Sequence, residues 1–208
     1  FLIDGSPFCR FYDCTVVVNG GLPANYAGWH FRQLNPLDID TGPFWGEVRG
    51  CTMRPWSGSD GFADFGVILE GTSNAVVVQD NSFGGADVHI EIRAQAGSGT
   101  DTTPNAILIS GNAFEGPTAA IGVRVTANGL YSTTGLRVVD NRFETIHTCV
   151  QFNGTAVLVQ NQAYIAGNYA DGSITHFVHN VSGVPVTNLD SAHLGVLTPN
   201  LATYTSKR

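Results

Sequence analysis

Two glutamates with basic neighbours are the side chains of this sequence best suited to chemistry. Glu70 and Glu91 each lie near the end of a short run in which apolar and variable residues alternate. His89 and Arg93 adjoin Glu91, and Arg124 belongs to the corresponding run of the next repeat. If the runs are neighbouring parallel strands, the carboxylates lie about 5 Å apart. That separation suits a retaining glycosidase, a wider one an inverting glycosidase, and close like charges raise one pKa, as a general acid requires. We therefore take Glu70, Glu91, His89 and Arg124 as catalytic candidates and Arg93 as a substrate-binding candidate.

The same cluster has other interpretations. It could abstract a proton beside a uronate carboxylate, as a polysaccharide lyase does. Arg93 and Arg124 could instead only neutralise the glutamates on a solvent-facing sheet, or the face could bind a glycan without cleaving it. The expected outward columns are His30, Ile68, His89, Arg124, Gln151 and, beside them, Arg32, Glu70, Glu91, Thr126, Asn153. A slip of one residue would turn a whole column inward.

Aromatic residues form a second candidate site. Trp29, Trp45 and Trp56 fall between residues 26 and 62, a stretch that also holds several aspartates. Aromatic faces beside carboxylates are typical of a groove that holds a polysaccharide, so we expect the three tryptophans to bind substrate. The alternative is that they close the end of the core or pack against a neighbouring subunit. Trp45 lies beside Glu47 and Val48, so core packing is its other interpretation.

A repeated motif predicts the elements that position these side chains. Each copy has an apolar residue, two further residues, Asn, one residue, and then an aromatic or Ala. The four asparagines are Asn81, Asn112, Asn141 and Asn168. Cys14 and Cys51 occupy the Asn slot in two earlier copies. Six copies at a period near 30 residues are typical of a solenoid, in which equivalent residues stack about 4.8 Å apart.

Each repeat also contains a second short run with period-two alternation, which predicts a strand with one buried face. No segment predicts a helix. We therefore expect an all-β, right-handed, single-stranded parallel β-helix (β-solenoid) of about six coils over residues 1–180. Buried asparagines would form a ladder at one bend, and the aromatics two residues later would stack as Phe83, Phe114 and Phe143. Residues 181–208 lose the motif and are expected to form a C-terminal cap or an extended arm.

The residue before each ladder position is acidic or glycine. Asp13, Asp80 and Asp140, with Glu144 nearby, could bind Ca²⁺ if they stacked. Glycines interrupt this column, so a bend that needs left-handed backbone explains it better, and we predict no metal and no cofactor. Cys14 and Cys51 would be near enough for a disulfide, although buried free thiols are the preferred interpretation.

Composition excludes several classes of protein. The chain has 208 residues, a formal net charge of −7, 13% charged and 43% hydrophobic residues, and 25 glycines. This balance excludes a disordered chain and a nucleic-acid binder that works through bulk positive charge. No apolar run is long enough to span a membrane, and no signal-peptide pattern opens the sequence. Because it opens without Met, we expect a piece of a longer or processed chain.

The repeat resembles that of the right-handed parallel β-helix, or pectin-lyase-like, superfamily over residues 9 to 180. Within it, the irregular Gly/Asn-rich repeats, the few lysines and the lack of the lyases' calcium-binding Asp clusters are most similar to a bacteriophage tailspike or tail fibre. The resemblance implies a homotrimer in the virion tail that contacts other phage tail proteins and binds bacterial surface polysaccharide. The alternatives are a secreted glycan-cleaving enzyme, either a glycoside hydrolase or a polysaccharide lyase, and a structural spacer with no ligand.

Overall fold

The structure, a computed structural model, describes residues 1–18, 25–35, 42–55, 63–94, 104–127, 135–154, 163–171 and 174–180. Within these ranges every strand pairing is parallel and no helix occurs. Trp56 and the predicted cap over residues 181–208 lie outside the described residues.

The strands form three parallel sheets. Sheet A contains β1 (Leu2–Asp4), β4 (Ala27–Arg32), β7 (Ala63–Glu70), β10 (Ala86–Arg93), β13 (Ile121–Ala127), β16 (Thr148–Gly154) and β19 (His176–Asn180). Sheet B contains β2 (Arg10–Tyr12), β5 (Glu47–Arg49), β8 (Val77–Gln79), β11 (Leu108–Ser110), β14 (Arg137–Val139) and β17 (Tyr164–Ala166). Sheet C contains β3 (Thr15–Val18), β6 (Thr52–Pro55), β9 (Ser82–Phe83), β12 (Ala113–Glu115), β15 (Arg142–Glu144) and β18 (Tyr169–Ala170).

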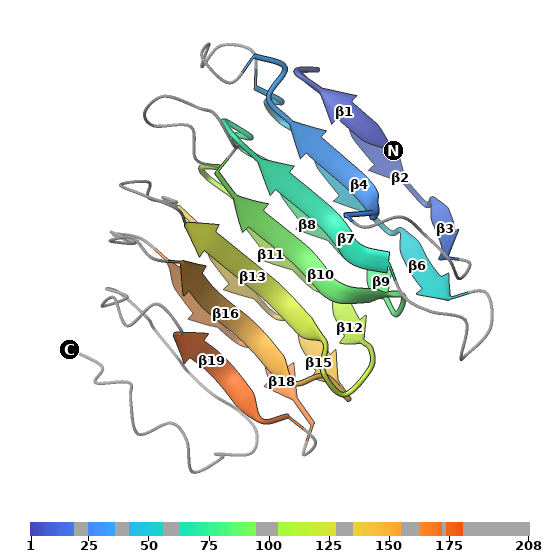
Figure 1. Cartoon of the computed structure of the whole chain (residues 1–208), viewed down its shortest axis with the longest axis vertical. Coiled ribbons are helices and arrows are strands. Elements are labelled where there is room, and N and C mark those ends of the chain that lie inside the picture. The colour runs from blue at the N-terminus through green and yellow to red at the C-terminus, as the bar shows by residue number, and fades with distance from the viewer. Residues whose placement is uncertain are drawn as a thin grey trace.

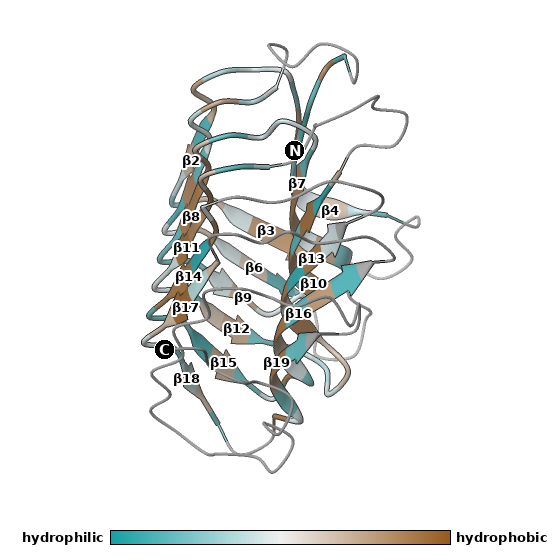
Figure 2. Ribbon diagram, turned by 90° about the vertical axis from the view of Figure 1, so that its left-hand side faces the viewer, coloured by the Kyte–Doolittle hydropathy of each residue, from teal (hydrophilic) through white to brown (hydrophobic). Residues whose placement is uncertain are grey.

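The chain visits sheets A, B and C in the same cyclic order from β1 to β19. Successive strands of each sheet therefore stack in sequence order, with β1 and β19 at opposite ends of sheet A (Figure 1). Viewed from the side, sheets A and B form two walls, and the strands of sheet C run between them (Figure 2). The predicted all-β class is confirmed, and the stacked parallel strands are compatible with the predicted β-solenoid.

Alternating side chains fill the space between the sheets. The middle residue of the sheet B strands is apolar and buried from β5 to β17: Val48, Val78, Ile109, Val138 and Ile165. In sheet C, the ring of Phe114 stacks on Phe83 with centroids 5.6 Å apart and on Phe143 with centroids 4.9 Å apart. The aromatic stack predicted from the repeat is therefore confirmed.

The Asn ladder lies at the bend between sheets B and C. Asn81 donates from its backbone N–H (3.0 Å) and its side-chain Nδ2 (2.9 Å) to Oδ1 of Asn112, and Asn112 makes the same two bonds to Asn141. Nδ2 of Asn81 also donates to the carbonyl of Val48. These bonds satisfy buried polar groups that would otherwise cost free energy. Cys51 ends the ladder, because its thiol replaces the amide that would continue it.

Aspartate and glycine alternate at the residue before each ladder position. Asp13, Gly50, Asp80, Gly111, Asp140 and Gly167 all have positive φ, between 53° and 66°. The carboxylates of the three aspartates lie where a Cβ on the next glycine in the stack would be. This geometry agrees with the turn interpretation of the column, since Asp tolerates left-handed backbone and glycine leaves room for its carboxylate.

Candidate functional site

The outer face of sheet A carries the predicted catalytic glutamates, but not in the predicted register. Glu91 pairs with Ile68 of β7 and Arg124 of β13, whereas Arg93 pairs with Glu70 and Thr126. The prediction that Glu70 and Glu91 are direct neighbours in one column is therefore wrong, since they are offset by two residues along adjacent strands. A two-residue offset preserves the side of the sheet, so both carboxylates still face outward.

His89 is not on that face, which corrects its prediction as a catalytic residue. Its side chain is fully buried, with its ring 6.2 Å from Phe83 and 5.5 Å from Phe114 between centroids. Neither ring nitrogen has a hydrogen-bond partner, and burial lowers the pKa of His89 to about 3. A neutral imidazole sealed among phenylalanines cannot contact a substrate.

A break in the alternation of sheet A explains the error. Val88 packs with Phe65 and Ile68 in a small apolar cluster apart from the main core, while Ile90 belongs to the main core. His89 therefore adds an inward residue between Val88 and Ile90. Residues at this level of the neighbouring strands are small: Gly28, Gly66, Gly122 and Cys149. The imidazole itself lies against Gly116, where an added Cβ would be 3.1 Å from Nε2. Strict period-two counting therefore misplaces the residues that precede Ile90.

Glu70 is held as a carboxylate by two basic partners. Its Oε2 accepts hydrogen bonds from His30 Nε2 at 2.8 Å and from Arg93 Nη2 at 2.8 Å. Burial alone would raise the pKa of Glu70, but the bonds from His30 and Arg93 outweigh it, so the pKa is lowered. Glu70 is thus ionised at neutral pH and suited to a base or nucleophile.

Glu91 has the opposite environment. It is 2% exposed, and burial raises its pKa although Arg124 Nε lies 2.6 Å from Oε2 and Thr126 also bonds to it. The guanidinium groups of Arg93 and Arg124 both lie over the ring of Phe65, at 5.6 and 5.7 Å from its centroid. The arginine side chains therefore cover the apolar cluster around Phe65 and neutralise the two glutamates at the same time.

This arrangement lowers the pKa of Glu70 and raises the pKa of Glu91, as is required when a general acid works beside an ionised carboxylate. However, both carboxylates are ion-paired and buried, so a substrate would have to displace Arg93 or Arg124 to reach them. The face is as well explained by structural ion pairing as by catalysis.

The tryptophans separate into different environments. Trp29 on β4 is fully buried and packs edge-to-face on Phe83 at 6.3 Å, so its prediction as a substrate-binding residue is wrong. Trp45 is 53% exposed and lies at the turn before β5. Its ring stacks on Phe8, which is 59% exposed, at 4.9 Å and 18°. Trp45 therefore has the exposure that a ligand-binding aromatic needs.

Sheet B presents an exposed outer face whose residues, apart from the nearby Trp45, were not predicted as site residues. Near Phe8 and Trp45, Glu47 accepts a 2.6 Å hydrogen bond from the Tyr12 hydroxyl and forms ion pairs with Arg10 and Arg49. The signal was present in the sequence, since these residues flank Phe11 and Val48 at period two. The outward columns in the sequence analysis come only from the second strand of each repeat, so they do not include these four residues.

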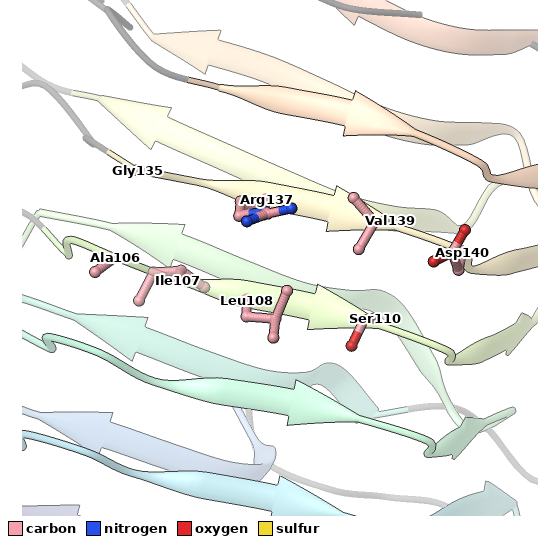
Figure 3. Close-up of a pocket in the computed structure, with 8 residues that line it drawn as sticks. All are labelled: Ala106, Ile107, Leu108, Ser110, Gly135, Arg137, Val139 and Asp140. Atoms are coloured by element: carbon pink, nitrogen blue, oxygen red, sulfur yellow. The ribbon is translucent and has the colours of Figure 1, made fainter. Parts of the chain in front are cut away.

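Further along the same face is a shallow groove of about 430 Å³ between β11 and β14 (Figure 3). Leu108, Ser110, Arg137, Val139 and Asp140 line it (Figure 3). The Arg137 guanidinium lies over the ring of Tyr164 on β17, 5.4 Å from its centroid. The outer face of sheet B thus carries arginines on β2, β5 and β14 and tyrosines on β2 and β17, but neither residue type on β8 or β11.

Three further features concern the cysteines, groups that could hold a metal ion, and membrane-spanning helices. All four cysteines are free, so Cys14 and Cys51 form no disulfide in this structure. The described residues contain no group of three or more His, Cys, Asp or Glu side chains placed to hold a metal ion. In the same ranges no helix is long and apolar enough to cross a membrane.

Comparisons with protein-family models, with curated proteins and with solved structures found no match to this chain.

Proposed function

We propose that this chain is a right-handed parallel β-helix of about six coils, of the phage tailspike or tail fibre type, that binds bacterial surface polysaccharide without cleaving it. The proposal includes assembly as a homotrimer in the virion tail with other phage tail proteins. The cyclic strand order and the Asn ladder support the β-helix.

The exposed aromatic pair carries the binding proposal. Phe8 and Trp45 both have positive φ, at 60° and 55°, a conformation that disfavours bulky side chains. The pair is largely exposed, so its burial offsets little of this strain. At the corresponding turns of later repeats the chain has Ala75, Ala106 and Gly135, also at positive φ.

Folding therefore needs only small residues at this corner, and the aromatic pair is best explained by contact with a ligand. The two rings stack face to face, so a pyranose ring would lie on an outer face of the stack, where its C–H groups contact the aromatic ring while its hydroxyls hydrogen-bond to polar side chains beside it. Tyr12, Glu47 and the two arginines supply the polar groups here.

Binding of fluorescently labelled bacterial capsule and lipopolysaccharide preparations tests the proposal, with the chain in excess. We expect wild-type binding, at least a tenfold weaker affinity for Trp45→Ala, and little change for Tyr169→Ala, an exposed aromatic on sheet C. Equal binding by both variants would contradict the role of Trp45, and no binding by the wild type would favour a spacer. Light scattering gives the mass, and a monomer would contradict the trimer.

Glycan cleavage is the second candidate, because the pKa values of Glu70 and Glu91 are shifted in opposite directions. If the chain hydrolyses glycans, it should release new reducing ends from the same preparations. Glu70→Gln and Glu91→Gln should then lose this activity while the fold is retained. An unsaturated product would indicate a lyase instead. Binding with no new chain ends supports the non-catalytic proposal.

A further inference from the structure

We propose that Cys14 and Cys51 form a modification site, at which a small disulfide oxidises the two thiols to a disulfide bond that links the first repeat of the stack to the second. The site lies at the end of the stack where β1, β2 and β3 are found (Figure 1). It does not depend on the binding of a glycan.

The two cysteines occupy adjacent positions of the stack. Cys14 directly precedes β3 and Cys51 directly precedes β6, and the first residues of these strands, Thr15 and Thr52, are paired. The Cys14 N–H donates to Sγ of Cys51 at 3.4 Å, and the two thiol groups hydrogen-bond to each other. Adjacent positions of paired strands place their Cα atoms about 4.8 Å apart, which is within the range that a disulfide spans.

The ladder lacks, at these two positions, the bond that joins its other side chains. Nδ2 of Asn81 donates to Oδ1 of Asn112, and the later asparagines of the ladder are joined in the same way. The Cys51 thiol instead donates to the carbonyl of Arg49 at 3.3 Å, which is a weak bond within its own strand connection. A disulfide would therefore give the ladder a covalent link where it has no amide side chains.

The first repeat has the most to gain from such a link. Among the described strands, β1, β2 and β3 are the end strands of their sheets, each paired on one side. The inward residues Phe11 and Val16 are only partly buried, whereas their partners Val48 and Met53 in the second repeat are buried. End repeats of a stack open at a lower free energy than internal ones. A bond between residues 14 and 51 would hold the first repeat against the second.

Cys14 is the thiol that an oxidant reaches, because it is half-buried whereas Cys51 is buried. Its thiolate attacks one sulfur of oxidised glutathione, forms a mixed disulfide and releases one glutathione thiolate. The Cys51 thiolate then attacks Sγ of Cys14 and releases the second. The two protein thiols are oxidised, their protons pass to the released thiolates, and the oxidant is reduced to two thiols. Burial raises the pKa of Cys51, so the second step should accelerate as the pH rises.

The other two cysteines are not placed to compete. Cys149 is fully buried on β16, in a later repeat. Cys9 lies at the opposite end of β2 from Cys14, and three residues of strand separate two positions by about 10 Å. That separation is longer than a disulfide can span.

Counting the thiols of the full chain tests the site. The chain is incubated with oxidised glutathione while folded, then unfolded in urea and titrated with a thiol reagent. We expect free thiols to fall from four to two, and a tryptic digest to contain a cross-link between Cys14 and Cys51. Cys14→Ser should keep its three thiols. Cys9→Ser is the matched control, because Cys9 is the other half-buried cysteine, and its thiols should fall from three to one. Circular dichroism checks that both variants fold.

Hydrogen exchange tests whether the bond holds the first repeat in place. The Thr52 N–H donates to the carbonyl of Cys14 at 2.8 Å, so it exchanges when the first repeat opens. In the oxidised chain this amide should exchange about tenfold more slowly than in the reduced chain. The Asn141 amide, which belongs to a later part of the ladder, should exchange at the same rate in both.

Several outcomes would overturn the inference. Four free thiols after oxidation, or a glutathione adduct on Cys14 that never closes, would contradict the site. A disulfide that involves Cys9 or Cys149, or one that joins two copies of the chain, would contradict the pairing. A bond between Cys14 and Cys51 that leaves the exchange of Thr52 unchanged would contradict the link between repeats. None of these results bears on polysaccharide binding, so the two proposals fail separately.

Discussion

Sheets A and B are built from the same repeats, yet their outer faces have opposite characters. The central strands of sheet A, β7 and β10, are eight residues long, and their outward arginines and glutamates form one-to-one pairs over an apolar cluster. Sheet B strands have three residues, and their outer face displays the exposed rings of Tyr12 and Tyr164 and arginines that are not matched one to one by glutamates. The longer strands carry more outward side chains each, so that arginines, glutamates and apolar residues cover one another there, whereas the contacts on sheet B are concentrated around Glu47. Sheet A, whose glutamates and arginines suggest catalysis in the sequence, is thus the sheet whose charged side chains are already paired with one another.

The two tryptophans give the largest contrast between the sheets. Trp29→Ala removes a fully buried side chain of β4, and we expect it to cost about 3–5 kcal/mol of unfolding free energy. Trp45→Ala removes an exposed ring, so its cost should stay within about 0.5 kcal/mol. Urea unfolding of both variants measures the difference. A large loss of stability in Trp45→Ala would show that the aromatic pair has a structural role.

Removing Arg124 tests whether the ion pairs of sheet A are structural. Arg124→Leu leaves Glu91 buried without its cationic partner, and we expect a loss of about 3–5 kcal/mol at pH 7. The loss should shrink as the pH falls, because protonation removes the uncompensated charge. The double variant Arg124→Leu/Glu91→Leu should recover most of the stability. If the single variant costs under about 1 kcal/mol, the pair is not structural, and the catalytic interpretation gains.

His89 makes the stability of sheet A depend on pH. Its pKa is about 3 in the folded chain, against an ordinary value of 6.5 for an unfolded chain, so the unfolded chain binds the proton first as the pH falls. The wild type should lose about 2 kcal/mol between pH 7 and pH 5 relative to His89→Leu, which has no proton to bind. Unfolding curves at the two pH values give this difference. Parallel losses in both proteins would contradict the buried, neutral imidazole.

Glu47 is the ion-paired glutamate of sheet B that corresponds to Glu91 of sheet A, and its substitution should have the smallest effect on stability. Glu47→Gln breaks two ion pairs whose arginine side chains are 49% and 40% exposed, and glutamine can still accept the hydrogen bond from Tyr12, so we expect a change in stability of at most about 1 kcal/mol. Urea unfolding of Glu47→Gln measures this change. A loss of more than about 2 kcal/mol would show that the contacts of Glu47 with Tyr12, Arg10 and Arg49 stabilise the fold.

The repeat was enough to predict the all-β class, the Asn ladder and the aromatic stack, because each is set by spacing along the chain. The register of β10 was not predictable in this way. An extra inward residue, His89, fits there because Gly66 on β7 leaves room for its backbone carbonyl and Gly116, which follows β12, leaves room for its ring, and that is a property of several segments together. Burial of Trp29 and exposure of Trp45 likewise depend on local geometry. Both tryptophans adjoin a strand-like pattern in the sequence, but only Trp45 has positive φ.

The alternation of aspartate and glycine at the bend after sheet B has an evolutionary consequence. Each aspartate needs a glycine in the following repeat, so the unit that can be copied without conflict is a pair of repeats. Duplication or deletion of one repeat would place two aspartates, or two glycines, next to each other. A chain of this kind is expected to lengthen or shorten by two repeats at a time.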